Sequence, residues 1–119
     1  MSDKYFTPKI EEIRVGIECE IPFETADNYK SIIIETKEEL HKLFSSYSNT
    51  RIRILYLNHE QVEKDGWFKK GEIFYKGLWS LVLLPNYRIT IKFGDEKRYF
   101  GKCKDVNTLR YICKLLEID

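Results

Sequence analysis

The sequence predicts an α+β fold, an antiparallel sheet of about five to six strands with two to three helices packed on one face. Two observations in the last third of the chain support it. Residues 87–93 and 97–103 alternate apolar and polar around a turn at residues 94–96, which indicates a β-hairpin. A helix opening at Asp105 or Asn107 follows, with one apolar stripe formed by Leu109, Ile112, Cys113 and Leu116. A third observation is that similar short alternating segments recur earlier in the chain.

The first of these segments is residues 13–21, whose odd-numbered members are apolar. Strict alternation predicts a half-buried strand, ended by Pro22 because proline cannot donate to the hydrogen-bond ladder. Residues 25–28 are rich in turn-forming types, and residues 31–35 predict a short β-branched strand.

A helix is expected to begin at Thr36, because Glu39 three residues later completes a capping box. Its apolar face is formed by Leu40, Leu43, Phe44 and Tyr47. A strand over residues 51–57 follows, and then a short helix opened by Asn58 with Gln61 and closed by Gly66.

Short strands are predicted near residues 72–76 and 79–84, before the final hairpin and helix. The chain of 119 residues is short enough for a single α+β domain spanning residues 1–119.

Charge is distributed unevenly along the chain. Residues 1–50 contain six Lys and Arg against ten Asp and Glu, which is −4, whereas residues 51–119 contain fourteen against nine, which is +5. A basic half suits nucleic acid or an acidic protein, and it equally suits two halves that attract each other within one fold.

Cys19, Cys103 and Cys113 are an odd set without short spacing, so buried thiols are expected rather than disulfides or a zinc site. The first residues form no apolar signal region, and no run approaches the roughly 18 apolar residues of a membrane span. A soluble, cytoplasmic protein is the expectation.

Candidate catalytic groups lack suitable neighbours. Glu18 and Glu20 would lie about 7 Å apart on one strand face, but charges on a solvent-facing strand surface are ordinary. Neither His41 nor His59 has a His or Cys three or four residues away. Nucleophile-elbow, dinucleotide and phosphate-loop glycine motifs are missing from the sequence. The sequence therefore predicts a protein that is not an enzyme, without cofactor or metal.

Two binding signals remain, of which the first is a basic strand face. Its expected members, with Arg51 and Arg53 included if they lie in the same sheet, are Arg51, Arg53, Arg88, Lys92, Arg98, Lys102 and Lys104. Clustered cations of this kind bind phosphate, and Phe100 on the same face can stack a base. The alternative is a solvated face whose Arg and Lys stems cover apolar surface.

The second signal interleaves aromatic residues with lysines around glycines. It runs from Trp67, Phe68, Lys69 and Lys70 through Phe74, Tyr75 and Lys76 to Trp79. Aromatic residues dominate interface hot spots, so the stretch is a candidate contact loop. The alternative is that Trp67 packs beyond a helix cap and Trp79 fills the core.

Three blocks carry a resemblance: YFTPKIEE at residues 5–12 leading into VGIECE at 15–20, DGW at 65–67, and YFGKCK at 99–104 before the last helix. Together they resemble a group of small uncharacterised proteins of Bacteroidota phages and prophages, with a pattern near TPxIEEfhvGFEyE, LGW and FxGxiKN. The resemblance covers nearly the whole chain. Ile17 and Cys19 depart from it by replacing aromatic residues, and Asp65 by replacing Leu.

The resemblance implies a phage context, in which small proteins without catalytic motifs are often inhibitors of host machinery, anti-CRISPR proteins among them. It therefore implies a non-enzymatic inhibitor that binds a host defence effector or its guide RNA complex in the cytoplasm of the bacterial host. One alternative is a small RNA- or DNA-binding protein that uses the basic sheet face. Another is a virion-associated or assembly module.

Overall fold

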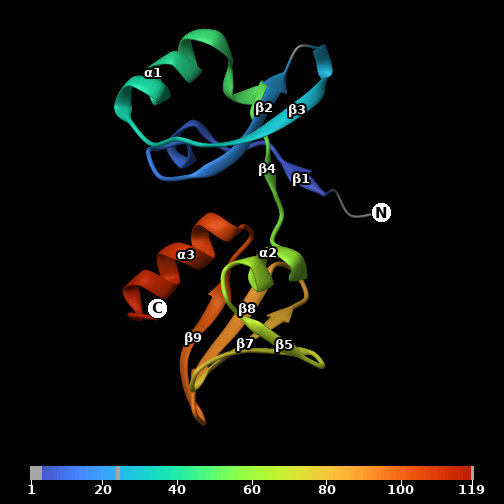
Figure 1. The fold of residues 1–119 in the computed structure, drawn as a ribbon, viewed down its shortest axis with the longest axis vertical. Coiled ribbons are helices and arrows are strands. Elements are labelled where there is room, and N and C mark those ends of the chain that lie inside the picture. The colour runs from blue at the N-terminus through green and yellow to red at the C-terminus, as the bar shows by residue number, and fades with distance from the viewer. Residues whose placement is uncertain (1–3, 24, 119) are drawn as a thin grey trace. The chain divides into compact units, whose positions relative to one another are not determined.

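The computed structural model describes residues 4–23 and 25–118. The chain forms two compact units, Met1–Tyr56 and Leu57–Asp119, each treated by itself below (Figure 1). Two compact units can belong to one domain, so the single domain stays a prediction. Three α-helices and nine strands in the described residues, with a five-stranded antiparallel sheet, confirm the α+β class.

The N-terminal unit contains two small antiparallel pairs and one helix. Strand β2 (Glu18–Phe23) pairs with β3 (Thr25–Ile33), and β1 (Tyr5–Phe6) pairs with β4 (Ile54–Leu55). Helix α1 (Lys37–Ser46) joins them, and 3-10 turns lie at Ile10–Glu12 and Asn49–Arg51. The buried core of the unit consists of Ile13, Ile17, Cys19, Ile21, Ile34, Leu43, Ile52 and Ile54.

Helix α1 begins at the predicted residue, since the Thr36 side chain accepts a hydrogen bond from the Glu39 backbone N–H at 3.1 Å. The predicted capping box is incomplete, because the Glu39 carboxylate accepts from the Glu35 N–H, at 2.9 Å, and not from that of Thr36. The predicted strand over residues 13–21 is wrong in its first half. Gly16 has a left-handed φ of 99°, which turns the chain there, and Val15 is consequently exposed. Pro22 does not end the strand: it pairs with Tyr29 at an irregularity of the ladder. The turn predicted at residues 25–28 lies within β3.

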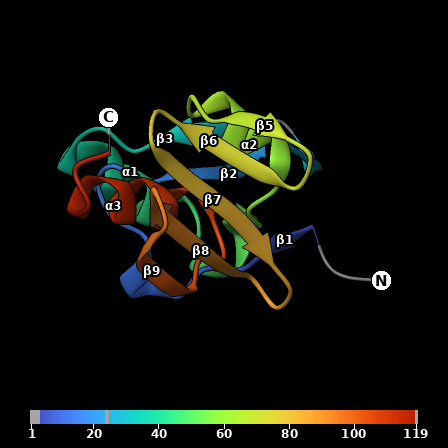
Figure 2. The same cartoon turned by 90° about the horizontal axis from the view of Figure 1, so that it is seen from below.

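The C-terminal unit is a five-stranded antiparallel meander with two helices. Its strands, in spatial as well as chain order, are β5 (Phe68–Lys70), β6 (Ile73–Lys76), β7 (Trp79–Leu84), β8 (Arg88–Phe93) and β9 (Glu96–Lys102). Helix α2 (His59–Lys64) precedes the sheet and α3 (Val106–Leu115) follows it. Figure 2 looks onto the five strands.

One face of this sheet is covered by both helices. Phe74, Leu81 and Ile91 are directly paired across β6, β7 and β8 and are almost completely buried. Val62 of α2 and Leu109 and Ile112 of α3 belong to the same core cluster. Each such side chain contributes roughly 1.5–3 kcal/mol on burial, so this layer stabilises the unit. The opposite face is left without a covering helix from this unit.

Both helices of this unit begin at the residues that the sequence indicates. Asn58 and Gln61 form the reciprocal capping box of α2, with bonds of 3.0 and 3.2 Å. The buried Asp105 carboxylate accepts from the Thr108 backbone N–H at 3.0 Å and so begins α3. After α2 the chain reverses at Gly66, whose φ of 96° is left-handed.

Candidate functional site

The face of the five-stranded sheet that carries neither helix of its unit is the surface best suited to binding. Residues paired across neighbouring strands share a face, so the ladder defines its members. We call this surface the outer sheet face. It consists of three rows of residues that are paired across neighbouring strands, and of the pair Lys70–Ile73 beside them. The rows are Phe68–Tyr75–Ser80–Lys92–Lys97, Val82–Thr90–Phe100 and Leu84–Arg88–Lys102.

The charge of the outer sheet face has a single sign. Its cations are Lys70, Arg88, Lys92, Lys97 and Lys102. Residues 57–119 contain nine Asp and Glu, yet none of the described ones belongs to this face. Glu72 and Asp95 lie in the turns between strands, and Glu96 pairs with Phe93 on the other side of the sheet. The face therefore presents a positive potential that suits an anionic partner.

Three aromatic rings are exposed between these cations. Phe68 is 69% exposed, Phe100 54% and Tyr75 38%. Phe68 and Tyr75 are directly opposite each other on β5 and β6, whereas Phe100 lies on the far edge strand, β9. The Lys97 ammonium lies 5.1 Å from the centre of the Phe100 ring. Exposed apolar rings next to cations offer both stacking and electrostatic contacts.

The structure brings together three of the seven predicted cations, Phe100, and three residues of the aromatic stretch. Arg88 and Lys102 are direct cross-strand neighbours, as are Thr90 and Phe100. Lys92 lies on the same face, and Phe68 and Lys70 of the second predicted group join it from β5. Residues from both predicted groups therefore lie on one surface.

Arg98 is not part of the outer sheet face. The ladder between β8 and β9 shifts between Ile91 and Lys92, so that Lys97, not Arg98, lies opposite Lys92. The Arg98 guanidinium instead lies 5.5 Å from the Phe93 ring and forms an ion pair with Glu96 at 3.4 Å. The alternation expected from the sequence fails here because a bulge moves every residue beyond it by one position.

Arg51 and Arg53 do not extend the basic face, because they belong to the N-terminal unit and not to the five-stranded sheet. Arg53 forms an ion pair with Glu20 at 2.8 Å and stacks on the rings of Tyr5 and Tyr29 at 3.7 and 3.8 Å. Arg51 lies 5.9 Å from the Tyr47 ring. Arg53 is thus held by partners within its own unit.

The remaining predicted residues lie off the outer sheet face. Trp67 is buried in the core, as the alternative interpretation held, and Trp79 packs against the same cluster. Lys69 pairs with Phe74, so it belongs to the opposite side of β5. Lys104 lies beyond the end of β9, and its carbonyl accepts a hydrogen bond from the Leu57 N–H at 2.8 Å.

Sequence reasoning missed Lys97 as a member of the site. Lys97 becomes a member only through the bulge, which leaves no local signal. Tyr75 was part of the predicted contact stretch, and it lies on the same face of β6 as Ile73. Its pairing with Phe68 required the short strand β5, which the sequence pattern does not indicate.

The other side chains that could take part in catalysis are buried or paired with other residues of the protein. Burial raises the pKa of Cys19 to about 11 and that of Cys103 to about 12, with smaller contributions from nearby acidic groups. Both thiols stay protonated at neutral pH, and the protonated form is a poor nucleophile. Glu20 is paired with Arg53, and the His59 ring packs edge-on against Phe74 with ring centres 5.4 Å apart.

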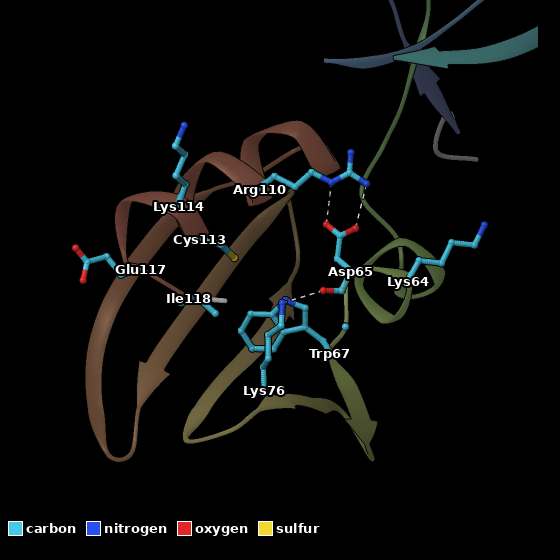
Figure 3. A pocket seen from close by; sticks show the side chains of 10 residues that line it. Lys64, Asp65, Trp67, Lys76, Arg110, Cys113, Lys114, Glu117 and Ile118 are labelled. Atoms are coloured by element: carbon cyan, nitrogen blue, oxygen red, sulfur yellow. Dashed lines mark hydrogen bonds and ion pairs between the residues drawn. The ribbon is translucent and has the colours of Figure 1, made fainter. Parts of the chain in front are cut away.

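A pocket of about 710 Å³ lies where α2 ends, beside β6 and α3 (Figure 3). Three residues that line it, Asp65, Lys76 and Arg110, are joined by hydrogen bonds. The Asp65 carboxylate accepts two hydrogen bonds from Arg110, at 2.9 and 3.0 Å, and the Asp65 carbonyl accepts one from Lys76 at 2.9 Å. The same Lys76 ammonium lies 5.7 Å from the centre of the Trp67 ring. Cys113 also lines the pocket, and burial raises the pKa of its thiol. These bonds hold the end of α2, β6 and α3 together, so the pocket is well explained as a structural junction.

Comparison with protein-family models, with curated proteins and with solved structures found no match to this chain. In the described part of the chain, no three His, Cys, Asp or Glu side chains gather closely enough to hold a metal ion. None of the helices there is long and apolar enough to cross a membrane.

Proposed function

We propose that this protein is a non-enzymatic binding protein that uses the outer sheet face to contact nucleic acid. The observation that supports this best is the charge of the face, which combines five cations with no described carboxylate. Lys and Arg that neutralise phosphates release counterions and supply much of the affinity of nucleic-acid complexes.

The arrangement of the cations supports the same proposal. Arg88 is directly opposite Lys102, and Lys92 is directly opposite Lys97. Like charges directly opposite each other on a sheet destabilise it. Two such pairs on one face lower the stability of the free protein, and a bound polyanion relieves the repulsion.

The inhibitor of a host defence ribonucleoprotein, expected from the resemblance to phage proteins, stays a prediction. It is compatible with the proposed interface, because the guide RNA of such a complex offers the same phosphates. In that case the protein acts inside the bacterial host cell.

The test is an affinity pull-down from bacterial host lysate, with and without nuclease and at two salt concentrations. The proposal expects nucleic acid to be recovered, to be lost after nuclease, and to decrease at high salt. A variant that combines Lys92→Gln with Lys102→Gln should recover less. A protein partner that survives nuclease and is retained by this variant would overturn the proposal.

A further inference from the structure

We infer that the outer sheet face binds single-stranded rather than duplex nucleic acid, with bases stacked at two places: the Phe68–Tyr75 pair and Phe100. This inference rests on the proposed function and adds the class of nucleic acid to it. Three observations carry it: the width of the face, the exposure of the rings and the position of the cations around them.

The width of the face argues against a duplex. Neighbouring strands lie about 4.8 Å apart, so the four spacings from β5 to β9 span roughly 19 Å. The major groove of B-DNA is only about 12 Å wide and admits one helix or a two-stranded ribbon. A five-stranded face therefore cannot enter the groove, and against a duplex it reaches the phosphates alone.

On a surface that binds nucleic acid, the exposed rings can stack only on bases that are accessible. In a duplex the bases are stacked on one another, whereas a single strand offers its bases to aromatic side chains. Phe68 and Phe100 are 69% and 54% exposed, and three strand spacings separate β6 from β9, roughly 14 Å. A single strand that crosses the sheet from β6 to β9 meets a ring at each end.

Two of the side chains between the two stacking places, Ser80 and Thr90, are short, and Val82 and Lys92 lie beside them. Ser80 and Thr90 lie in the rows that connect Tyr75 and Phe100 to the central strands. They leave room for nucleotides to pass over the middle of the sheet. The hydroxyl groups of Ser80 and Thr90 can donate to or accept from bases or sugars.

Each stacking place has a cation beside it. Lys97 lies 5.1 Å from the Phe100 ring centre, and Lys70 lies two residues from Phe68 on the same face of β5. A base stacked on either ring therefore places its phosphate near an ammonium group. Stacking with a flanking cation is the combination that single-strand binders use.

The experiment measures fluorescence anisotropy of a labelled 12-nucleotide oligothymidine and of the matching duplex with oligoadenine, each titrated with the full chain. The wild type should bind the single strand more tightly than the duplex. Phe100→Leu and Phe68→Leu should each weaken single-strand binding by roughly 5- to 150-fold, which corresponds to the loss of one stacked base. Duplex binding should stay the same in both variants. Phe100→Trp keeps a ring at the site and should retain binding.

Tyr111→Leu is the matched control. Tyr111 is as exposed as Phe100, at 54%, but it lies on α3. The variant should bind as the wild type does. Because all three aromatic residues are exposed, the leucine variants are expected to fold, and thermal unfolding checks this.

The outcomes separate this inference from the function on which it rests. If both leucine variants bind the single strand as wild type while Lys92→Gln weakens binding to single strand and duplex alike, single-strand stacking is wrong and phosphate binding stands. If the folded wild type binds neither probe at low salt, the proposed function fails as well.

Discussion

The salt dependence of binding is a quantitative consequence of the outer sheet face. For single strands the logarithm of the binding constant falls by about 0.7 for each phosphate neutralised, per unit of log salt. Five cations belong to the face, so the slope should reach at most about −3.5. A rise from 50 to 200 mM salt should then weaken binding by roughly 100-fold.

Replacing Lys92 and Lys102 together by Gln should flatten this dependence. With three cations left, the slope should be about −2, and the same rise in salt should weaken binding by only about 20-fold. The two residues come from different like-charged cross-strand pairs, so the double variant should also be more stable than the wild type, by roughly 0.4–2 kcal/mol. Anisotropy titrations at four salt concentrations measure the slope, and urea unfolding measures the stability.

The matched control is Lys64→Gln with Lys114→Gln, which removes two exposed lysines that line the pocket of Figure 3 and are not members of the outer sheet face. Its slope should equal that of the wild type. An equal change of slope in both double variants would show that binding follows total charge, and the assignment of the interface would be refuted.

Three further predictions concern stability. Asp105→Ala removes the side-chain cap of α3 and should lower the free energy of unfolding by about 1–2 kcal/mol. Asp105→Asn keeps a hydrogen-bond acceptor and should lower it less. Equal losses for the two variants in urea titrations would contradict the cap. Burial raises the pKa of Cys19 to about 11, so the unfolded chain releases this proton at a lower pH than the folded one. The free energy of unfolding should therefore fall between about pH 9 and 11, by roughly 3 kcal/mol at most for this thiol, and the fall should be shallower in Cys19→Ala; identical profiles would disprove it. Arg53→Met removes an ion pair and two ring contacts, and should cost about 1–2 kcal/mol. Glu20→Gln in the Arg53→Met background should cost less than in the wild type, and strict additivity of the two changes would count against the pair.

Local signals predicted the elements that depend on near neighbours. The capping residues of all three α-helices and the strands at 79–84 and 87–93 agree closely with the structure. The failures come from interactions that alternation does not encode. The turn at Gly16 interrupts an otherwise regular alternating pattern. Strand β5, only three residues long, forms because Phe68 pairs with Tyr75 across a turn.

The candidate site was predictable where the register of the β8–β9 hairpin is regular. Arg88, Phe100 and Lys102 share a face because all three lie on the side of the bulge away from the turn, where Arg88 pairs with Lys102 and alternation holds along both strands. Arg98 was misplaced because the bulge shifts the register by one residue. Assigning Arg53 requires knowing which strands pair across the whole chain, and no local pattern supplies that.

The placement of Trp67 and Trp79 has a practical consequence. They are the only two tryptophans of the chain, and both lie in the Leu57–Asp119 unit, so intrinsic tryptophan emission reports on that half alone. Circular dichroism in the far ultraviolet reports on both halves. If the two signals change at the same urea concentration, the halves unfold cooperatively, as a single domain requires. Separate midpoints would give each half its own free energy of unfolding.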